Sequence, residues 1–146
     1  MGIQSRIVRR FPQWVRVSPM DVMFVFLGIP SGILNLAGLA RSNALVNVLP
    51  GWGTKVWAVA ILAGCVMWLV GLTSITENNG HLVLTRMPAL LLGLYLVSLT
   101  TLVYGVALIV FSGWSGFLAS VPLFVISGGT WLRRVDFSSR FRGETS

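Results

Sequence analysis

Three long apolar runs without charged residues dominate the pattern of hydrophobic and polar positions along the chain. The first extends from Val22 to Ala40, the second from Val56 to Ile75, and the third from Met87 to Leu132. A helix of about 20 residues crosses the bilayer core, which is about 30 Å thick, because an α-helix rises about 1.5 Å per residue. The pattern therefore predicts helices that span a membrane, with short polar connections between them.

The third run must fold back on itself, because it is about twice as long as one crossing needs. Two glycines, two serines and Trp114 are clustered between Ser112 and Gly116. Such a cluster is typical of a turn at a membrane interface. The sequence thus predicts an all-α fold, a polytopic bundle of four transmembrane helices. The expected spans are 22–40, 56–75, 89–111 and 116–132, within a transmembrane domain of residues 20–132.

The first span is preceded by the signals of a helix start. Ser18 is suited to the N-cap, Pro19 to the first turn, and Asp21 to the acidic position of a capping box. We therefore expect Ser18 and Asp21 to cap the first helix. The alternative is that this span is a signal peptide, cleaved after a small-residue site that ends at Ala40.

Charged residues make up only 10% of the chain, whereas 55% of its residues are hydrophobic. A soluble domain carries roughly a quarter charged residues, so this composition favours a membrane protein. Eleven Lys and Arg against four Asp and Glu give a net charge of +7, concentrated near the two ends of the chain. The interior is too apolar to present a basic surface to nucleic acid. Anionic lipid headgroups are therefore the expected partner of the positive charge.

The distribution of basic residues predicts the orientation of the chain. Arginines are frequent before the first span and in the basic tail at residues 133–146, whereas the first connection contains only Arg41 and Lys55. Both termini are therefore expected on the cytoplasmic side of a bacterial cytoplasmic membrane. The tryptophans expected at the outer interface are Trp52, Trp57 and Trp114, and those expected at the inner interface are Trp14 and Trp131.

Residues 1–19 combine apolar residues at helical spacing with arginines on the opposite face. This pattern predicts an amphipathic helix that lies in the membrane interface. The alternative is a basic prefix that only orients the chain during insertion. The residues expected to contact lipid headgroups, in this segment and at the start of the tail, are Arg6, Arg9, Arg10, Trp14, Arg16, Arg133 and Arg134.

Small and hydroxylated residues recur every three or four positions within the spans, as in the pair Gly28 and Gly32. Such stripes let helix backbones approach closely and let hydroxyl groups bond across the gap. They favour packing within the four-helix bundle; self-association, or the polar lining of a water-filled path, is the alternative. The residues assigned to helix packing are Gly28, Gly32, Asn35, Gly38, Ala60, Gly64, Gly71, Ser98, Thr101 and Gly105.

Residues suited to catalysis do not form a recognisable motif. No serine lies in a nucleophile elbow, and no span contains paired carboxylates. Glu77 and His81 are four positions apart, but an Asn-Asn-Gly sequence between them indicates a turn in a solvated loop. The single cysteine, Cys65, excludes an intrachain disulfide. We therefore expect a protein that is not an enzyme and that binds no cofactor or metal.

The layout of the chain resembles that of small membrane proteins encoded by bacteriophages of actinobacteria, some of which are holins. The shared features are a basic amphipathic start, closely spaced spans, a connection from Arg41 to Trp52 that leads into a Trp-bearing second span, and an arginine-rich tail. This resemblance extends over most of the chain, but it is one of layout, so no functional residue is carried over.

The resemblance implies a protein that accumulates in a bacterial cytoplasmic membrane, associates with further copies and permeabilises it. The alternative is a non-catalytic accessory subunit or exclusion factor that acts on other membrane proteins. A small channel or transporter is less favoured, because no ionisable residue lies in the middle of a span. For the same reason the chain departs from the small multidrug-resistance transporters, which share its size.

Overall fold

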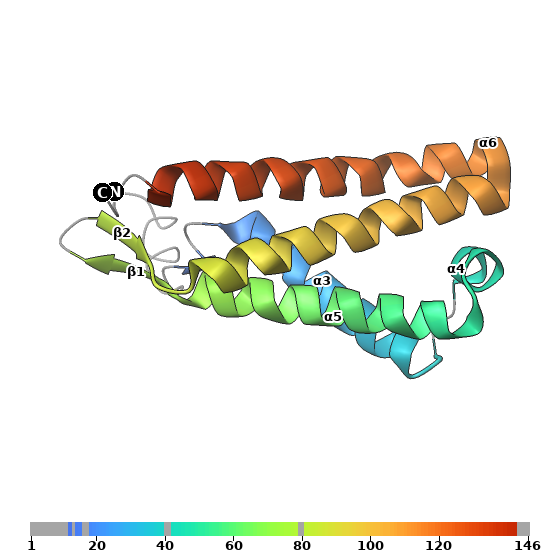
Figure 1. Ribbon diagram of the computed structural model, residues 1–146, viewed down its shortest axis with the longest axis horizontal. Helices are drawn as coiled ribbons and strands as arrows, with labels where there is room; N and C mark the ends of the chain where they lie inside the picture. The colour runs from blue at the N-terminus through green and yellow to red at the C-terminus, as the bar shows by residue number, and fades with distance from the viewer. Residues whose placement is uncertain (1–11, 13, 16–17, 40–41, 79–80, 143–146) are drawn as a thin grey trace, which may run out of the picture.

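A computed structural model describes residues 12, 14–15, 18–39, 42–78 and 81–142. Among these residues, three helices are long and apolar enough to cross a membrane, and the last of them contains a reversal of the chain. The elements are α3 (Pro19–Leu36), α4 (Asn43–Val48), α5 (Gly51–Thr73), β1 (Ile75–Asn78), β2 (His81–Leu84) and α6 (Met87–Arg142) (Figure 1).

Helix α3 begins at Pro19 as expected, but it ends at Leu36, before the predicted limit of the first span. The helix stops where Gly38 adopts a positive φ of 74°. The N–H of Leu39 then donates to the carbonyl oxygen of Leu34 at 2.9 Å, which satisfies one of the carbonyl groups left open at the helix end. The left-handed conformation at Gly38 therefore terminates α3 in the manner common for glycine.

The connection between α3 and α5 contains the short helix α4, which the hydropathy pattern did not predict. Ala44 and Leu45 of α4 are buried, and the helix packs against α6 and α5. The hydroxyl of Ser42, just before α4, donates to the phenol oxygen of Tyr104 in α6 at 3.3 Å. Helix α5 then begins at Gly51, earlier than predicted, so Lys55 lies inside the helix.

The segment between α5 and α6, where the sequence predicted a turn in a solvated loop, is a β-hairpin whose two strands were not predicted. Strands β1 and β2 pair antiparallel, with Ile75 opposite Leu84 and Asn78 opposite His81. The two residues that separate the strands in the sequence are Asn and Gly, the dipeptide favoured in two-residue hairpin turns. The fold is thus helical apart from this hairpin.

Helix α6 consists of two helical arms that meet at Gly113, where the backbone leaves the helical region (φ 58°, ψ −130°). We call residues 87–112 the first arm and residues 114–142 the second arm. The arms run antiparallel and lie side by side (Figure 1). The predicted turn was therefore in the right place but too wide, since one residue reverses the chain. The second arm continues to Arg142, well past the predicted end of the fourth span at Leu132.

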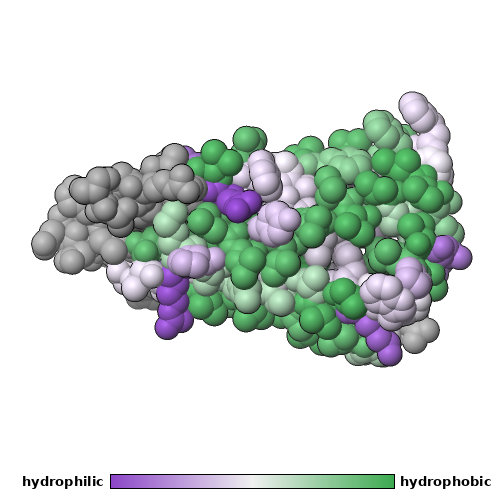
Figure 2. Space-filling view, in the orientation of Figure 1, coloured by the Kyte–Doolittle hydropathy of each residue, from purple (hydrophilic) through white to green (hydrophobic). Residues whose placement is uncertain are grey.

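The core lies where α5 packs against α3 on one side and α6 on the other. Its largest fully buried side chains include Trp68, Leu72, Leu90 and Leu94. Large apolar side chains also cover much of the outer surface of the helices, as the green surface in Figure 2 shows. Exposed apolar side chains along the whole length of such helices are expected where lipid, and not water, surrounds a protein.

Candidate functional site at the helix interfaces

Glycines of α3 allow close contact with α5. A methyl group added at Gly28 would collide with the Sγ atom of Cys65, and one added at Gly32 would lie 3.1 Å from the Cβ atom of Leu62. Both glycines of the predicted GxxxG pair therefore face α5 of the same chain. Cys65 is buried at this contact, as a small apolar residue would be.

Glycines also determine how closely α5 approaches the first arm. A methyl group at Gly71 would lie 2.6 Å from the Cα atom of Leu90, and one at Gly64 would lie 3.0 Å from the Cβ atom of Leu96. Gly93 of the first arm, which was not singled out in the sequence, faces the backbone of Trp68 at an even closer approach. The spacing of Gly64 and Gly71 indicated this face, whereas Gly93 has no glycine neighbour at helical spacing to reveal it.

The two arms of α6 are joined by hydroxyl groups and small residues. Ser98 donates to the carbonyl oxygen of Ser127 at 3.0 Å, Ser127 donates to that of Ser98 at 2.9 Å, and their hydroxyl oxygens are 3.1 Å apart. Closer to the reversal, Gly105 faces the ring of Phe124, with ring atoms 3.2 Å from the site of an added methyl group. Ser98 and Gly105 therefore lie on the face of the first arm that meets the second.

The remaining residues assigned to helix packing are Asn35, Gly38, Ala60 and Thr101. The amide of Asn35 donates to the carbonyl oxygen of Ser31 in its own helix at 2.9 Å, and the hydroxyl of Thr101 bonds to carbonyl groups of its own turn. Ala60 is half-buried on α5. Asn35 and Gly38 line a pocket of about 190 Å³ between α3, α4 and α5. The hydrogen bonds of Asn35 and Thr101 thus stay within their own helices, and the role of these four positions in helix packing stays a prediction.

A polar cluster links the start of α3 to the second arm. The Nε and Nη2 atoms of Arg133 each lie 3.3 Å from Oδ2 of Asp21, and Nη2 also donates to the hydroxyl of Ser18 at 3.1 Å. Asp21 is 6% exposed and Ser18 is 1% exposed, whereas the side chain of Arg133 is 39% exposed. A carboxylate so deeply buried is stabilised by the opposite charge beside it.

This cluster corrects the expectation that Ser18 and Asp21 cap α3. Ser18 does occupy the N-cap position, but its side chain makes no capping hydrogen bond. It accepts a hydrogen bond from Arg133 instead, and Asp21 is the partner of the same guanidinium group. Arg133, which was expected only to contact lipid headgroups, therefore also connects two helices. No local pattern could reveal a pair whose members lie 112 positions apart.

The remaining residues expected at the membrane interface differ in their surroundings. The guanidinium carbon of Arg134 lies 5.2 Å from the ring centres of both Tyr95 and Trp131, within the range of cation–π contacts. Trp14 is half-buried and packs against the core. The arginines at positions 6, 9, 10 and 16, and the amphipathic helix expected there, lie outside the described residues.

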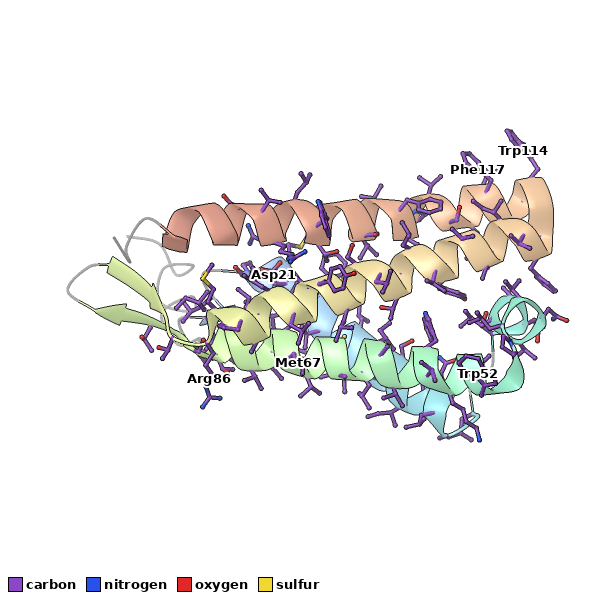
Figure 3. The ribbon with its side chains drawn as sticks, in the orientation of Figure 1. Asp21, Trp52, Met67, Arg86, Trp114 and Phe117 are labelled. Atoms are coloured by element: carbon purple, nitrogen blue, oxygen red, sulfur yellow. The ribbon has the colours of Figure 1, made fainter. Side chains whose placement is uncertain are left out.

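The tryptophans expected at the outer interface also divide into two kinds. Trp52 and Trp114 are exposed, and Figure 3 places them at the end of the bundle opposite to Arg86. Trp57, by contrast, is buried, and its Nε1 atom donates to the carbonyl oxygen of Thr100 at 2.9 Å. Trp57 therefore joins α5 to the first arm, and its assignment to the outer interface stays a prediction.

Two grooves flank the second arm. The first, which we call the Ser127 groove, has a volume of about 410 Å³ and lies between the two arms, with Ser98, Ser127 and Gly128 among its lining residues. The second, which we call the Asp21 groove, has a volume of about 390 Å³. It is lined by residues of α3, α5 and the second arm, namely Met20, Asp21, Phe24, Trp68, Val125, Ile126, Gly129, Thr130 and Arg133.

The described residues bring no three His, Cys, Asp or Glu side chains together in a group that could hold a metal ion. The described residues of this site thus provide hydroxyl groups, the half-buried ion pair of Asp21 and Arg133, and two partly open grooves beside the second arm. No family model matches this chain, and no curated protein or solved structure matches it.

Proposed function

We propose that this chain is an integral membrane protein with four crossings, in which α6 crosses the membrane twice. The distance along the second arm supports this, since the step from Trp114 to Arg133 spans about 28 Å at about 1.5 Å per residue. That length is close to the thickness of the hydrocarbon core. Trp114 is 80% exposed at one end of this span, and Arg133 belongs to the polar cluster at the other.

The proposed orientation places both termini on the cytoplasmic side of a bacterial cytoplasmic membrane. Arg86 lies at the end of the bundle that carries the β-hairpin, and Arg133 contacts Asp21 in the first turn of α3. Lys55 and the exposed tryptophans Trp52 and Trp114 lie towards the opposite end. Because basic residues are retained preferentially on the cytoplasmic side, this asymmetry supports the assignment that the arginine distribution favours.

We further propose that the protein permeabilises this membrane, as holins do. The proposal rests mainly on the grooves on both sides of the second arm, each of which has polar residues in a mostly apolar lining. Ser98 and Ser127 line one groove, and Asp21 and Thr130 line the other. Hydroxyl groups beside an apolar exterior supply hydrogen-bond partners for water once the arm moves away from its neighbours or copies associate.

We also propose that copies of the chain associate with one another, but through a different surface from the glycine pairs that the sequence indicated. The pair Gly28 and Gly32 and the pair Gly64 and Gly71 are already covered by helices of the same chain. Gly128 and Gly129, on the second arm, have open space where a side chain would be. A second copy would therefore meet the second arm, where backbone can be approached closely.

Induced expression in a bacterial host tests the proposal. The wild-type protein should collapse the membrane potential and admit a membrane-impermeant dye. Ser127→Ala removes a hydroxyl from the interface between the arms and should reduce dye uptake at equal protein level. Ser115→Ala is the matched control, because the hydroxyl of Ser115 bonds to the carbonyl oxygen of Ser112 near the reversal and faces neither groove.

Cells that stay sealed while the protein accumulates in their membrane would refute permeabilisation. Purification in a mild detergent then addresses the alternative role, that of an accessory or exclusion factor for other membrane proteins. A foreign membrane protein present in stoichiometric amount would favour that role, whereas assemblies of this chain alone agree with holin-like behaviour.

A further inference from the structure

Trp68 carries a polar group for which the described residues provide no partner. Its side chain is 1% exposed, and its Nε1 atom is buried without a hydrogen bond to any of them. A buried N–H without an acceptor costs about 1 to 3 kcal/mol, so such groups usually have a partner. The other buried indole of α5, that of Trp57, does have one in the carbonyl oxygen of Thr100.

Trp68 forms part of the wall of the Asp21 groove. Most of the remaining wall is apolar, with Met20 and Phe24 on α3 and Val125 and Ile126 on the second arm. At one end the groove reaches the ion pair of Asp21 and Arg133. The groove therefore combines apolar side chains with a charged pair, and one of its lining residues, Trp68, has an unsatisfied buried donor.

We propose that the Asp21 groove binds one anionic glycerophospholipid. In this arrangement an acyl chain lies between α3 and the second arm, and the headgroup phosphate lies at Arg133. An ester carbonyl of the same lipid accepts the hydrogen bond from Nε1 of Trp68. This inference needs the chain to be embedded in a membrane, but it does not depend on permeabilisation.

The depths of Asp21, Trp68 and Arg133 along their helices support a bound lipid. Asp21 lies in the first turn of α3, and Trp68 lies about 8 Å along α5 from its end at Thr73, at about 1.5 Å per residue. The interfacial zone of each leaflet is several ångströms thick and holds the ester groups directly beneath the phosphates. A headgroup at Arg133 therefore brings ester carbonyls to the level of Trp68.

The positive charge and the partial exposure of Arg133 support an anionic lipid in particular. The side chain of Arg133 is 39% exposed, so a phosphate can reach its guanidinium group beside the contact with Asp21. Guanidinium groups bind phosphate through directed hydrogen bonds. The apolar part of the groove, lined by Met20, Phe24, Val125 and Ile126, suits an acyl chain better than water, because a stable buried water needs two to four polar partners.

Two neighbouring glycines provide a matched pair of variants. Gly128 and Gly129 both have open space beside them, but Gly129 lines the Asp21 groove whereas Gly128 lines the Ser127 groove. Gly129→Leu should fill the first groove and prevent lipid binding, and Gly128→Leu should leave it intact. Trp68→Phe keeps a ring in the wall but removes the N–H, and should lower lipid affinity about fivefold.

Native mass spectrometry of the full chain in mild detergent measures these effects, with added phosphatidylglycerol or phosphatidylcholine. The wild type and Gly128→Leu should retain one phosphatidylglycerol in preference to phosphatidylcholine, and excess inorganic phosphate should not displace it. Equal retention by Gly129→Leu, equal loss in both glycine variants, or displacement by phosphate would overturn the proposal. If Gly129→Leu does not fold, Trp68→Phe decides, since unchanged affinity in that variant refutes the assigned hydrogen bond and the site.

Discussion

Asp21, in the first turn of α3, accepts hydrogen bonds from two nitrogen atoms of Arg133, near the end of the apolar part of α6. The two residues are separated by 112 positions, and their contact joins α3 to the second arm. Helix α3 packs mainly against α5, and the second arm packs against the first arm through Ser98 and Ser127. The ion pair therefore connects α3 to the second arm, which the Asp21 groove otherwise separates.

Breaking this pair should destabilise the protein. Asp21→Asn keeps the size of the side chain but removes the negative charge that faces the guanidinium group of Arg133, at a cost of about 1 to 3 kcal/mol, between the values for exposed and buried pairs. The coupling energy between the two side chains is obtained by measuring unfolding in detergent for Asp21→Asn, Arg133→Gln and the double variant. We expect about 1 to 2 kcal/mol of coupling. Effects that simply add would show that the two side chains do not interact.

Gly71→Ala should destabilise the contact between α5 and the first arm. The added methyl group would lie 2.6 Å from the Cα atom of Leu90, and backbone cannot move aside as a flexible side chain can. Overpacking of this kind typically costs about 1 to 3 kcal/mol. Gly128→Ala is the control: space is open there, and alanine favours a helix over glycine by about 0.5 to 1 kcal/mol. Thermal unfolding should thus shift in opposite directions, and a stabilised Gly71→Ala would contradict the packing.

Gly113→Ala also adds one methyl group, but it tests the backbone conformation of the reversal and not helix packing. A methyl group at Gly113 would meet nothing within 4 Å, so any cost comes from the backbone. The φ of 58° and ψ of −130° mirror the extended conformation that L-residues favour, and turns with such a residue select glycine. We expect a loss of about 1 to 3 kcal/mol in the free energy of unfolding. A neutral effect in the same unfolding assay would show that another residue reverses the chain.

The sequence was informative wherever the signal is local. Apolar runs identified the three long helices, because a membrane imposes one composition over about 20 consecutive residues. The excess length of the third run, together with the glycines near Trp114, located the reversal. The glycine stripes also pointed to faces that now lie against neighbouring helices, as at Gly28 and Gly64.

Features that depend on distant residues or on short segments could not be found in this way. Helix α4 has six residues, too few for a periodic pattern to stand out. The β-hairpin did carry a local signal, the Asn-Gly pair between Asn78 and His81, which was interpreted as a turn but not as the turn of a hairpin. The ion pair of Asp21 and Arg133 carries none, since each residue has an adequate local explanation, as a helix cap and as part of a basic tail.

We propose that α6 crosses the membrane twice, with Gly113 on the outer side. Cysteine accessibility in intact cells tests this topology. The variants are Ser115→Cys and Thr85→Cys in a Cys65→Ala background, both at exposed positions that flank the first arm. A membrane-impermeant maleimide should label position 115 in intact cells and position 85 only after the membrane is opened. Labelling of both positions from the same side, or a protein that stays in solution without detergent, would contradict the account.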